Sequence, residues 1–120
     1  MRLLLATAQT DLRLSLELLL SEQPGVEIVG TASESDGLLA LTRTCRPDMI
    51  MTDWNLPGRP LPNILSEAAN LPTHPKIIIL TTLNSYNQAA LDAGADAVVL
   101  KGASPDLLLA TFERVRGKAA

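Results

Sequence analysis

Residues 47–58 read PDMIMTDWNLPG and decide how this chain folds. An apolar run ends abruptly in one carboxylate, Asp53, and a turn follows at Pro57 and Gly58. This pattern predicts a buried strand that carries Asp53 to the edge of a sheet, with a loop directly behind it. Open α/β sheets build their functional sites at the carboxyl ends of parallel strands. We therefore expect the function to depend on what the other strands place beside Asp53.

Strand and helix patterns alternate five times along the 120 residues. Short apolar runs predict strands at residues 2–7, 26–31, 48–53, 76–81 and 96–100. Helices are expected at residues 11–22, from a capping box at Ser33 to about Cys45, from Pro60 or later, at 84–93 and at 105–116. Because the strands are apolar on both faces, the pattern predicts an α/β fold with a parallel sheet between two helical layers. We expect one domain over residues 1–116, with residues 117–120 as a tail or the start of a linker.

Composition excludes several classes of function. Aromatic residues make up 2% of the chain and the net charge is −3, which argues against direct nucleic-acid binding. Cys45 is the only cysteine, so no internal disulfide or cysteine metal cluster can form. The apolar runs are too short or too interrupted for a signal peptide or a membrane span. These features predict a cytoplasmic protein that does not contact a membrane.

The expected strand ends bring a few polar side chains to one edge. Thr7 and Ala8 follow the first strand, Asp53 ends the third, Thr81 ends the fourth and Lys101 follows the fifth. A carboxylate beside a hydroxyl and an ammonium would suit a phosphoryl group, with Asp53 as nucleophile and the other two neutralising its oxygens. The same residues could equally be strand-end polar groups joined by an ion pair.

Several short motifs in this order resemble one family. They are Arg46-Pro47-Asp48, Asp53-Trp54-Asn55-Leu56-Pro57-Gly58, Leu80-Thr81-Thr82, Gly94-Ala95-Asp96 and Leu100-Lys101. Over residues 2–116 the chain resembles the receiver (CheY-like) domain of bacterial response regulators, most of all receivers that precede a LuxR/NarL-type DNA-binding domain. The resemblance implies a flavodoxin-like fold with strand order 2-1-3-4-5. It also implies that Asp53 is the phosphoacceptor position, Thr81 the switch hydroxyl and Lys101 the conserved lysine.

The chain departs from the family where a metal would bind. In the family, an acidic pair after the first strand binds Mg²⁺ with the phosphoacceptor and a backbone carbonyl, which would here be that of Asn55. This chain has Thr7 and Ala8 at those places. Mg²⁺ prefers carboxylate oxygens, so we expect no cofactor, and Mg²⁺ only if it is held weakly. Asp11 is the nearest other acid and would have to bend back from the following helix.

The parts that switch in the family are altered as well. Val98 stands where the family has an aromatic residue on the fifth strand. The stretch from Thr81 to Lys101 is about two residues shorter than the family pattern, and residues 59–62, RPLP, make the loop after Asp53 stiff. A stiff loop favours a fixed surface over a switch.

These features predict an atypical receiver that is not an enzyme and acts in transcription regulation through protein–protein contacts. The expected partner is a histidine kinase, an effector or output domain, or a second copy, bound through the last two helices and the strand between them. Without a metal, Lys101 should pair with Asp53 directly. Two alternatives stay open: a receiver that does accept phosphate on Asp53, and a small-ligand sensor with a pocket at Thr7, Ala8 and Trp54.

Overall fold

The computed structural model describes residues 1–117 and contains a five-stranded parallel sheet between two helical layers. The elements in chain order are β1 (Arg2–Ala6), α1 (Thr10–Ser21), β2 (Glu27–Ala32), α2 (Ser35–Cys45), β3 (Met49–Asp53), α3 (Leu61–Ala69), β4 (Lys76–Thr81), η1 (Asn84–Tyr86), α4 (Asn87–Asp92), β5 (Ala97–Leu100) and α5 (Pro105–Gly117). The strand order is β2-β1-β3-β4-β5, which confirms the flavodoxin-like prediction. The predicted tail falls partly on residues 118–120, which lie outside the described residues.

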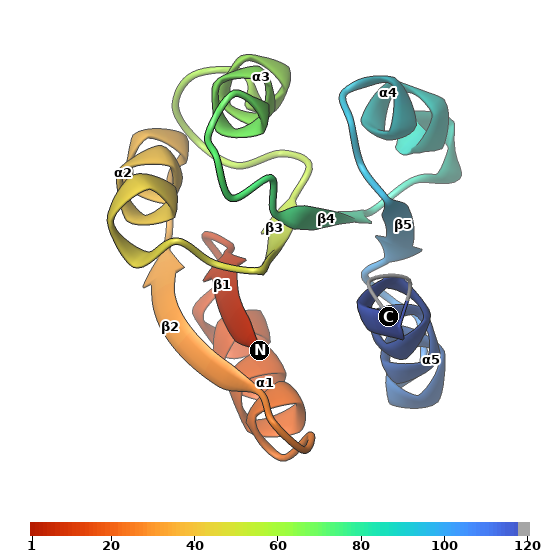
Figure 1. Cartoon of the computed structure of the whole chain (residues 1–120). Helices are drawn as coiled ribbons and strands as arrows, with labels where there is room; N and C mark the ends of the chain where they lie inside the picture. Colours follow the sequence, from red (N-terminus) through yellow and green to blue (C-terminus); the bar gives the residue numbers. More distant parts are fainter. Residues whose placement is uncertain (118–120) are drawn as a thin grey trace.

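Each face of the sheet has its own apolar core. Figure 1 shows α2, α3 and α4 on one side of the strands and α1 and α5 on the other. The α1 and α5 side buries Leu20, Met51 and Phe112, and the opposite side buries Ile50 and Ile79. Successive residues of a strand point to opposite faces, so strands covered on both sides must be apolar throughout. The sequence therefore shows continuous apolar runs rather than alternation.

Most helix signals in the sequence are confirmed. Leu61, Ile64, Leu65 and Ala68 are all buried on α3, as their spacing after Pro60 predicts. The backbone N–H of Leu107 donates to the side chain of Ser104, which caps α5. Gly94 has φ +109° and ends the α4 segment in a conformation that favours glycine.

The capping box predicted at Ser33 is wrong. The cap of α2 is Glu34, whose carboxylate accepts hydrogen bonds from the backbone N–H groups of Asp36 (3.0 Å) and Gly37 (2.6 Å). The N–H of Ser35 donates instead to the carbonyl of Pro57, 2.8 Å away in the loop after β3. This tertiary contact fixes where α2 begins.

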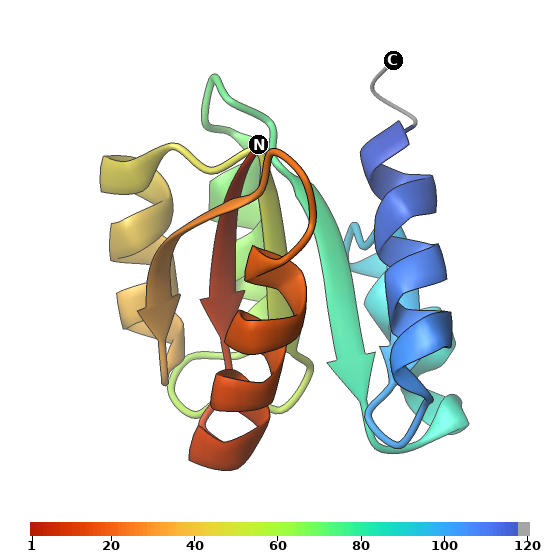
Figure 2. The same cartoon turned by 90° about the horizontal axis from the view of Figure 1, so that it is seen from below.

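All five strands end at the same edge of the sheet, at the bottom of Figure 2, and the loops that follow them meet there. In the same view, α1 lies in front of the strands and α5 lies to the right. Within residues 1–117, no helix is long and apolar enough to cross a membrane.

Candidate functional site

The sheet positions the strand-end residues through its own backbone. The N–H of Thr7 donates to the carbonyl of Ala32 (2.9 Å), and the N–H of Lys101 donates to the carbonyl of Thr81 (2.8 Å). These bonds extend the ladder one residue past β1 and β5. The backbone of Thr7 and Lys101 is therefore fixed by the sheet.

Asp53 is buried and receives two donors on one oxygen. Its side chain accepts a hydrogen bond from the Thr7 hydroxyl at 2.6 Å and forms an ion pair with the Lys101 ammonium at 3.1 Å, both through Oδ2. The residue is 2% exposed, and the Lys101 side chain is 18% exposed. The sequence-based prediction that Lys101 pairs with Asp53 is confirmed. A buried carboxylate needs such a partner, because an isolated charge in the interior is costly.

Sequence reasoning missed Gln9. Its side-chain carbonyl accepts a hydrogen bond from Lys101 Nζ at 3.1 Å, and its backbone N–H donates to Thr7 Oγ1 at 3.1 Å. Gln9 is the N-cap residue of α1 but makes no side-chain capping bond. Glutamine is a poor N-cap, and this poor choice at the sheet edge was the only signal available in the sequence.

Three buried oxygens near this edge have no hydrogen-bond partner among residues 1–117. Oδ1 of Asp53 and Oγ1 of Thr81 lie at the ends of β3 and β4, and Oγ of Ser35 lies at the start of α2; Thr81 is 1% exposed. Unpartnered buried polar atoms are uncommon in folded proteins. Asp53, Thr81 and Lys101 thus occupy neighbouring strand ends as predicted, but the Thr81 hydroxyl is bonded to neither of the other two.

The side chains at the remaining predicted positions are exposed. Ala8 and Asn55 lie on the surface, and Asp11 is an exposed residue in the first turn of α1. Across the described part of the chain, no group of three His, Cys, Asp or Glu residues is placed to hold a metal ion. The side-chain oxygens in this network besides those of Asp53 come from Thr7, which bonds Asp53, and Gln9, which bonds Lys101, and both residues are uncharged.

The loop after β3 is fastened to two helices. Arg59 forms ion pairs with Asp36 of α2 (2.9 Å) and Glu67 of α3 (3.1 Å), and these hydrogen bonds raise the pKa of the Arg59 guanidinium above its usual range. Gly58 has φ +107°, and a Cβ there would lie 2.3 Å from Ser35 Oγ. The close approach and the positive φ both require glycine, which holds the loop against α2.

An aromatic pair covers the other side of the site. The rings of Trp54 and Tyr86 lie 6.4 Å apart between centroids, so the loop after Asp53 contacts the η1 segment after β4. Tyr86 is half-buried. It brings an aromatic ring next to the loop after Asp53 from an element other than β5, where Val98 stands.

Comparisons with known proteins agree with this geometry. A family model described as "Response regulator receiver domain" matches residues 3–113. The chain is 30% identical over 110 residues to the nitrate/nitrite response regulator protein NarL of Escherichia coli K12, covering 89% of this chain and 51% of NarL. It is 32% identical over 114 residues to the transcriptional regulatory protein PdtaR of Mycobacterium tuberculosis H37Rv, covering 93% of this chain and 55% of PdtaR.

Solved structures give the same result. A DNA-binding response regulator of the LuxR family from Staphylococcus aureus superposes with a TM-score of 0.85 at 27% identity, covering 95% of this chain and 97% of that one. The chain spans about half the length of the curated relatives NarL and PdtaR.

Proposed function

The chain belongs to the response regulator receiver family of two-component signalling, and we propose that it is an atypical member that works through protein–protein contact, with weak or no Mg²⁺-dependent phosphorylation of Asp53. The observation that carries this proposal is the pair Thr7 and Ala8 at the end of β1. Ala8 has no side-chain oxygen, and Thr7 donates its hydroxyl proton to Asp53. These donors do not fit Mg²⁺, which takes an octahedral set of oxygens that usually includes carboxylates.

The chemistry of phosphoryl transfer then works against Asp53. A bound metal ion would offset the repulsion between the carboxylate and the negatively charged donor. Without it, Lys101 is the cation that faces Asp53, and its ammonium is already paired. The carboxylate is also 2% exposed, which leaves little room for a phosphoryl donor to approach. Both features should slow transfer severely.

The surface formed by α4, β5 and α5 is the proposed contact for a partner. Leu91 of α4 and Leu107 of α5 are 46% and 55% exposed, and a hollow lies between Thr82, Val98 and Leu107. Exposed apolar side chains beside a hollow are a feature of protein contact sites. The proposed partner is a histidine kinase, an effector or output domain, or a second copy of this chain.

The proposal also includes a place in the cell and an output. We place the chain in the cytoplasm, give it no enzymatic activity of its own, and assign its output to transcription regulation without direct DNA contact by residues 1–117. The similarity to NarL, a nitrate/nitrite response regulator, and to PdtaR, a transcriptional regulatory protein, supports that output.

A phosphorylation assay tests the proposal. The protein is incubated with Mg²⁺ and acetyl phosphate, and intact mass is followed with time. We expect no gain of a phosphoryl group in the parent chain. The double variant Thr7→Asp/Ala8→Asp, which supplies two carboxylates beside Asp53, is the matched positive control and should gain one. A gain in the parent that disappears in Asp53→Asn would overturn the proposal.

A second candidate function is a receiver that does accept phosphate on Asp53. Two of the unpartnered oxygens, Asp53 Oδ1 and Thr81 Oγ1, favour it, because a phosphoryl group on Oδ1 would give the Thr81 hydroxyl an acceptor. The same mass measurement separates the two candidates. A second substitution, Thr81→Ala, should leave any phosphorylation in place if Thr81 only responds to it.

A further inference from the structure

Four residues at the carboxyl edge form a closed ring of polar contacts. The N–H of Gln9 donates to Thr7 Oγ1, and the Thr7 hydroxyl donates to Asp53 Oδ2. Lys101 Nζ then bridges back, since it lies 3.1 Å from Asp53 Oδ2 and 3.1 Å from Gln9 Oε1. The ring contains one negative and one positive charge. It therefore balances its own charge without any other ion.

The direction of each bond in the ring is fixed by chemistry. A hydroxyl has one proton, and the backbone N–H of Gln9 occupies a lone pair of Thr7 Oγ1, so the Thr7 proton goes to Asp53. A lysine ammonium can only donate, so both Asp53 Oδ2 and Gln9 Oε1 must accept from Lys101. Gln9 thus acts twice, once through its backbone and once through its side chain.

The position of Gln9 in α1 indicates that its side chain serves the ring and not the helix. An N-cap side chain ordinarily accepts a hydrogen bond from the first turn, yet the Gln9 amide makes none. The helix still begins at Thr10, because the Gln9 backbone carbonyl accepts from the N–H of Arg13 at 3.0 Å. A local preference that is left unmet beside a buried charge pair is typical of a functional position.

We infer that Gln9 is a positioning residue that holds the Lys101 ammonium over Asp53 and makes Lys101 the resident cation of this site. Two oxygen partners, each 3.1 Å away, keep the ammonium in place, whereas Asp53 alone would leave the flexible lysine side chain free to turn toward water. The ring ties the ends of β1, β3 and β5 to the start of α1. That a partner protein binds this edge as a fixed surface rests on the proposed function. The ring of contacts does not depend on it.

Selective acylation of lysine amines tests the inference. The chain has three lysines, at 76, 101 and 118, so peptide mass spectrometry can follow Lys101 with Lys76 of β4 as an internal reference. In the parent, Lys101 should react much more slowly than Lys76. Gln9→Ala should raise the Lys101 rate roughly ten-fold, the size expected when a hydrogen bond to a charged group is lost.

Two further variants separate positioning from a general loss of structure. Gln9→Glu keeps an acceptor at the same reach and should leave Lys101 as slow as in the parent. Gln23→Ala removes a glutamine whose amide bonds the other end of α1, and it should not change the Lys101 rate. An unchanged Lys101 rate in Gln9→Ala, or a Gln9→Glu variant as fast as Gln9→Ala, would overturn the inference.

Labelling of Lys101 in the presence of Mg²⁺ is the last test. Millimolar Mg²⁺ should leave the Lys101 rate of the parent unchanged, because the ammonium already occupies the carboxylate. Faster labelling in Mg²⁺ would mean that a metal ion displaces Lys101, which also overturns the inference. If acetyl phosphate phosphorylates the parent while Gln9→Ala still frees Lys101, the proposed function fails and the ring stands.

Discussion

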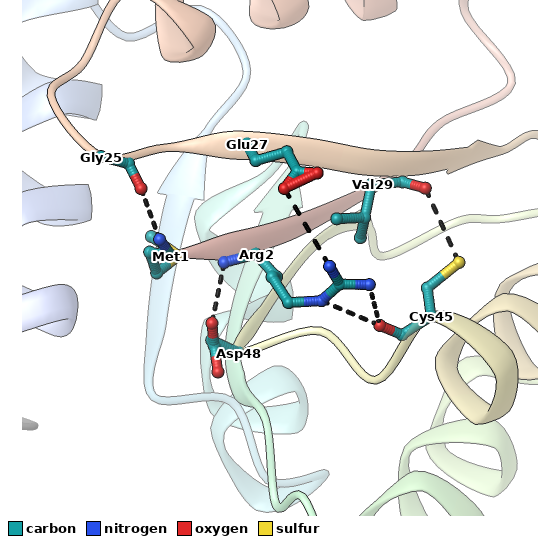
Figure 3. A network of polar contacts seen from close by, with 7 residues as sticks. All are labelled: Met1, Arg2, Gly25, Glu27, Val29, Cys45 and Asp48. Carbon is teal, nitrogen blue, oxygen red and sulfur yellow. Dashed lines mark hydrogen bonds and ion pairs between the residues drawn. The ribbon is translucent and has the colours of Figure 1, made fainter.

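The two edges of the sheet hold their charged side chains in different ways. At the amino edge, shown in Figure 3, charged side chains bond mainly to backbone groups. The Arg2 guanidinium donates to the carbonyl of Cys45 at 2.6 and 3.1 Å and lies 4.0 Å from Glu27. Asp48 accepts from the Arg2 N–H at 2.8 Å. These side chains remain largely exposed, so water can replace any partner that is lost.

At the carboxyl edge, side chains bond mainly to one another; Thr7, Asp53 and Thr81 are buried, Lys101 is partly buried and Gln9 is exposed. Asp53 is shared by Thr7 and Lys101 on one oxygen, while its other oxygen and the Thr81 hydroxyl have no partner in the described part of the chain. A network that only held the strands together would not need to leave such atoms unpaired. This difference supports the proposal that the carboxyl edge is the functional one.

The largest expected effect comes from removing the cation of the carboxyl edge. Lys101→Met should lower the free energy of unfolding by about 3 kcal/mol at pH 7, because it leaves the Asp53 charge buried without its partner. Urea denaturation followed by circular dichroism measures this change. Lys76→Met, a lysine of β4 without a salt bridge among residues 1–117, is the matched control and should cost less than about 0.5 kcal/mol.

Equal losses of stability in Lys101→Met and Lys76→Met would contradict this prediction. The double variant Asp53→Asn/Lys101→Met tests its cause. Removing both charges should restore part of the stability lost in Lys101→Met alone, since no uncompensated charge then remains in the interior.

A smaller effect is expected from the hydroxyl of the same network. Thr7→Val keeps the shape of the side chain but removes the 2.6 Å hydrogen bond to Asp53 and the acceptor for the Gln9 N–H. The loss should be about 1–2 kcal/mol, the cost of leaving buried polar groups unpaired. Thr31→Val on the edge strand β2, where the threonine hydroxyl makes no hydrogen bond to the described residues, is the control and should be nearly neutral. A neutral Thr7→Val would mean that the Thr7 bond contributes nothing to the edge.

The sequence predicted the fold well because buried positions show a regular pattern of apolar residues. Continuous apolar runs marked strands covered on both faces, and the spacing of Leu61, Ile64, Leu65 and Ala68 marked the buried side of α3. Asp53 and Lys101 could also be placed, because each stands where an apolar run stops.

Contacts between loops that are far apart in the sequence produce no such pattern. The start of α2 depends on the Pro57 carbonyl, which takes the N–H of Ser35 and moves the cap from Ser33 to Glu34. Gln9 stands in a loop without periodicity, and its role follows only from Lys101, 92 residues along the chain. Such pairings are set by tertiary structure, which a single sequence reports only where the residue types are unusual.

The smallest effect is expected at the amino edge. Arg2→Met removes the hydrogen bonds to the Cys45 carbonyl at the end of α2 and the weak ion pair with Glu27. The expected loss is about 1 kcal/mol, because the side chain is exposed and water can satisfy the carbonyl. Arg43→Met, in the last turn of the same helix but without a salt bridge to residues 1–117, is the control and should cost less.

The effect of salt distinguishes the two edges more clearly than the sizes of the stability losses do. Exposed charges are screened by molar NaCl, so the difference between Arg2→Met and Arg43→Met should shrink in urea denaturation at high salt. The loss in Lys101→Met should persist, because salt does not reach a carboxylate that is 2% exposed. If both losses shrank together, the Asp53 and Lys101 pair would behave as a surface ion pair. The carboxyl edge would then have to open in solution far more often than its contacts imply, and Asp53 would be accessible to a phosphoryl donor after all.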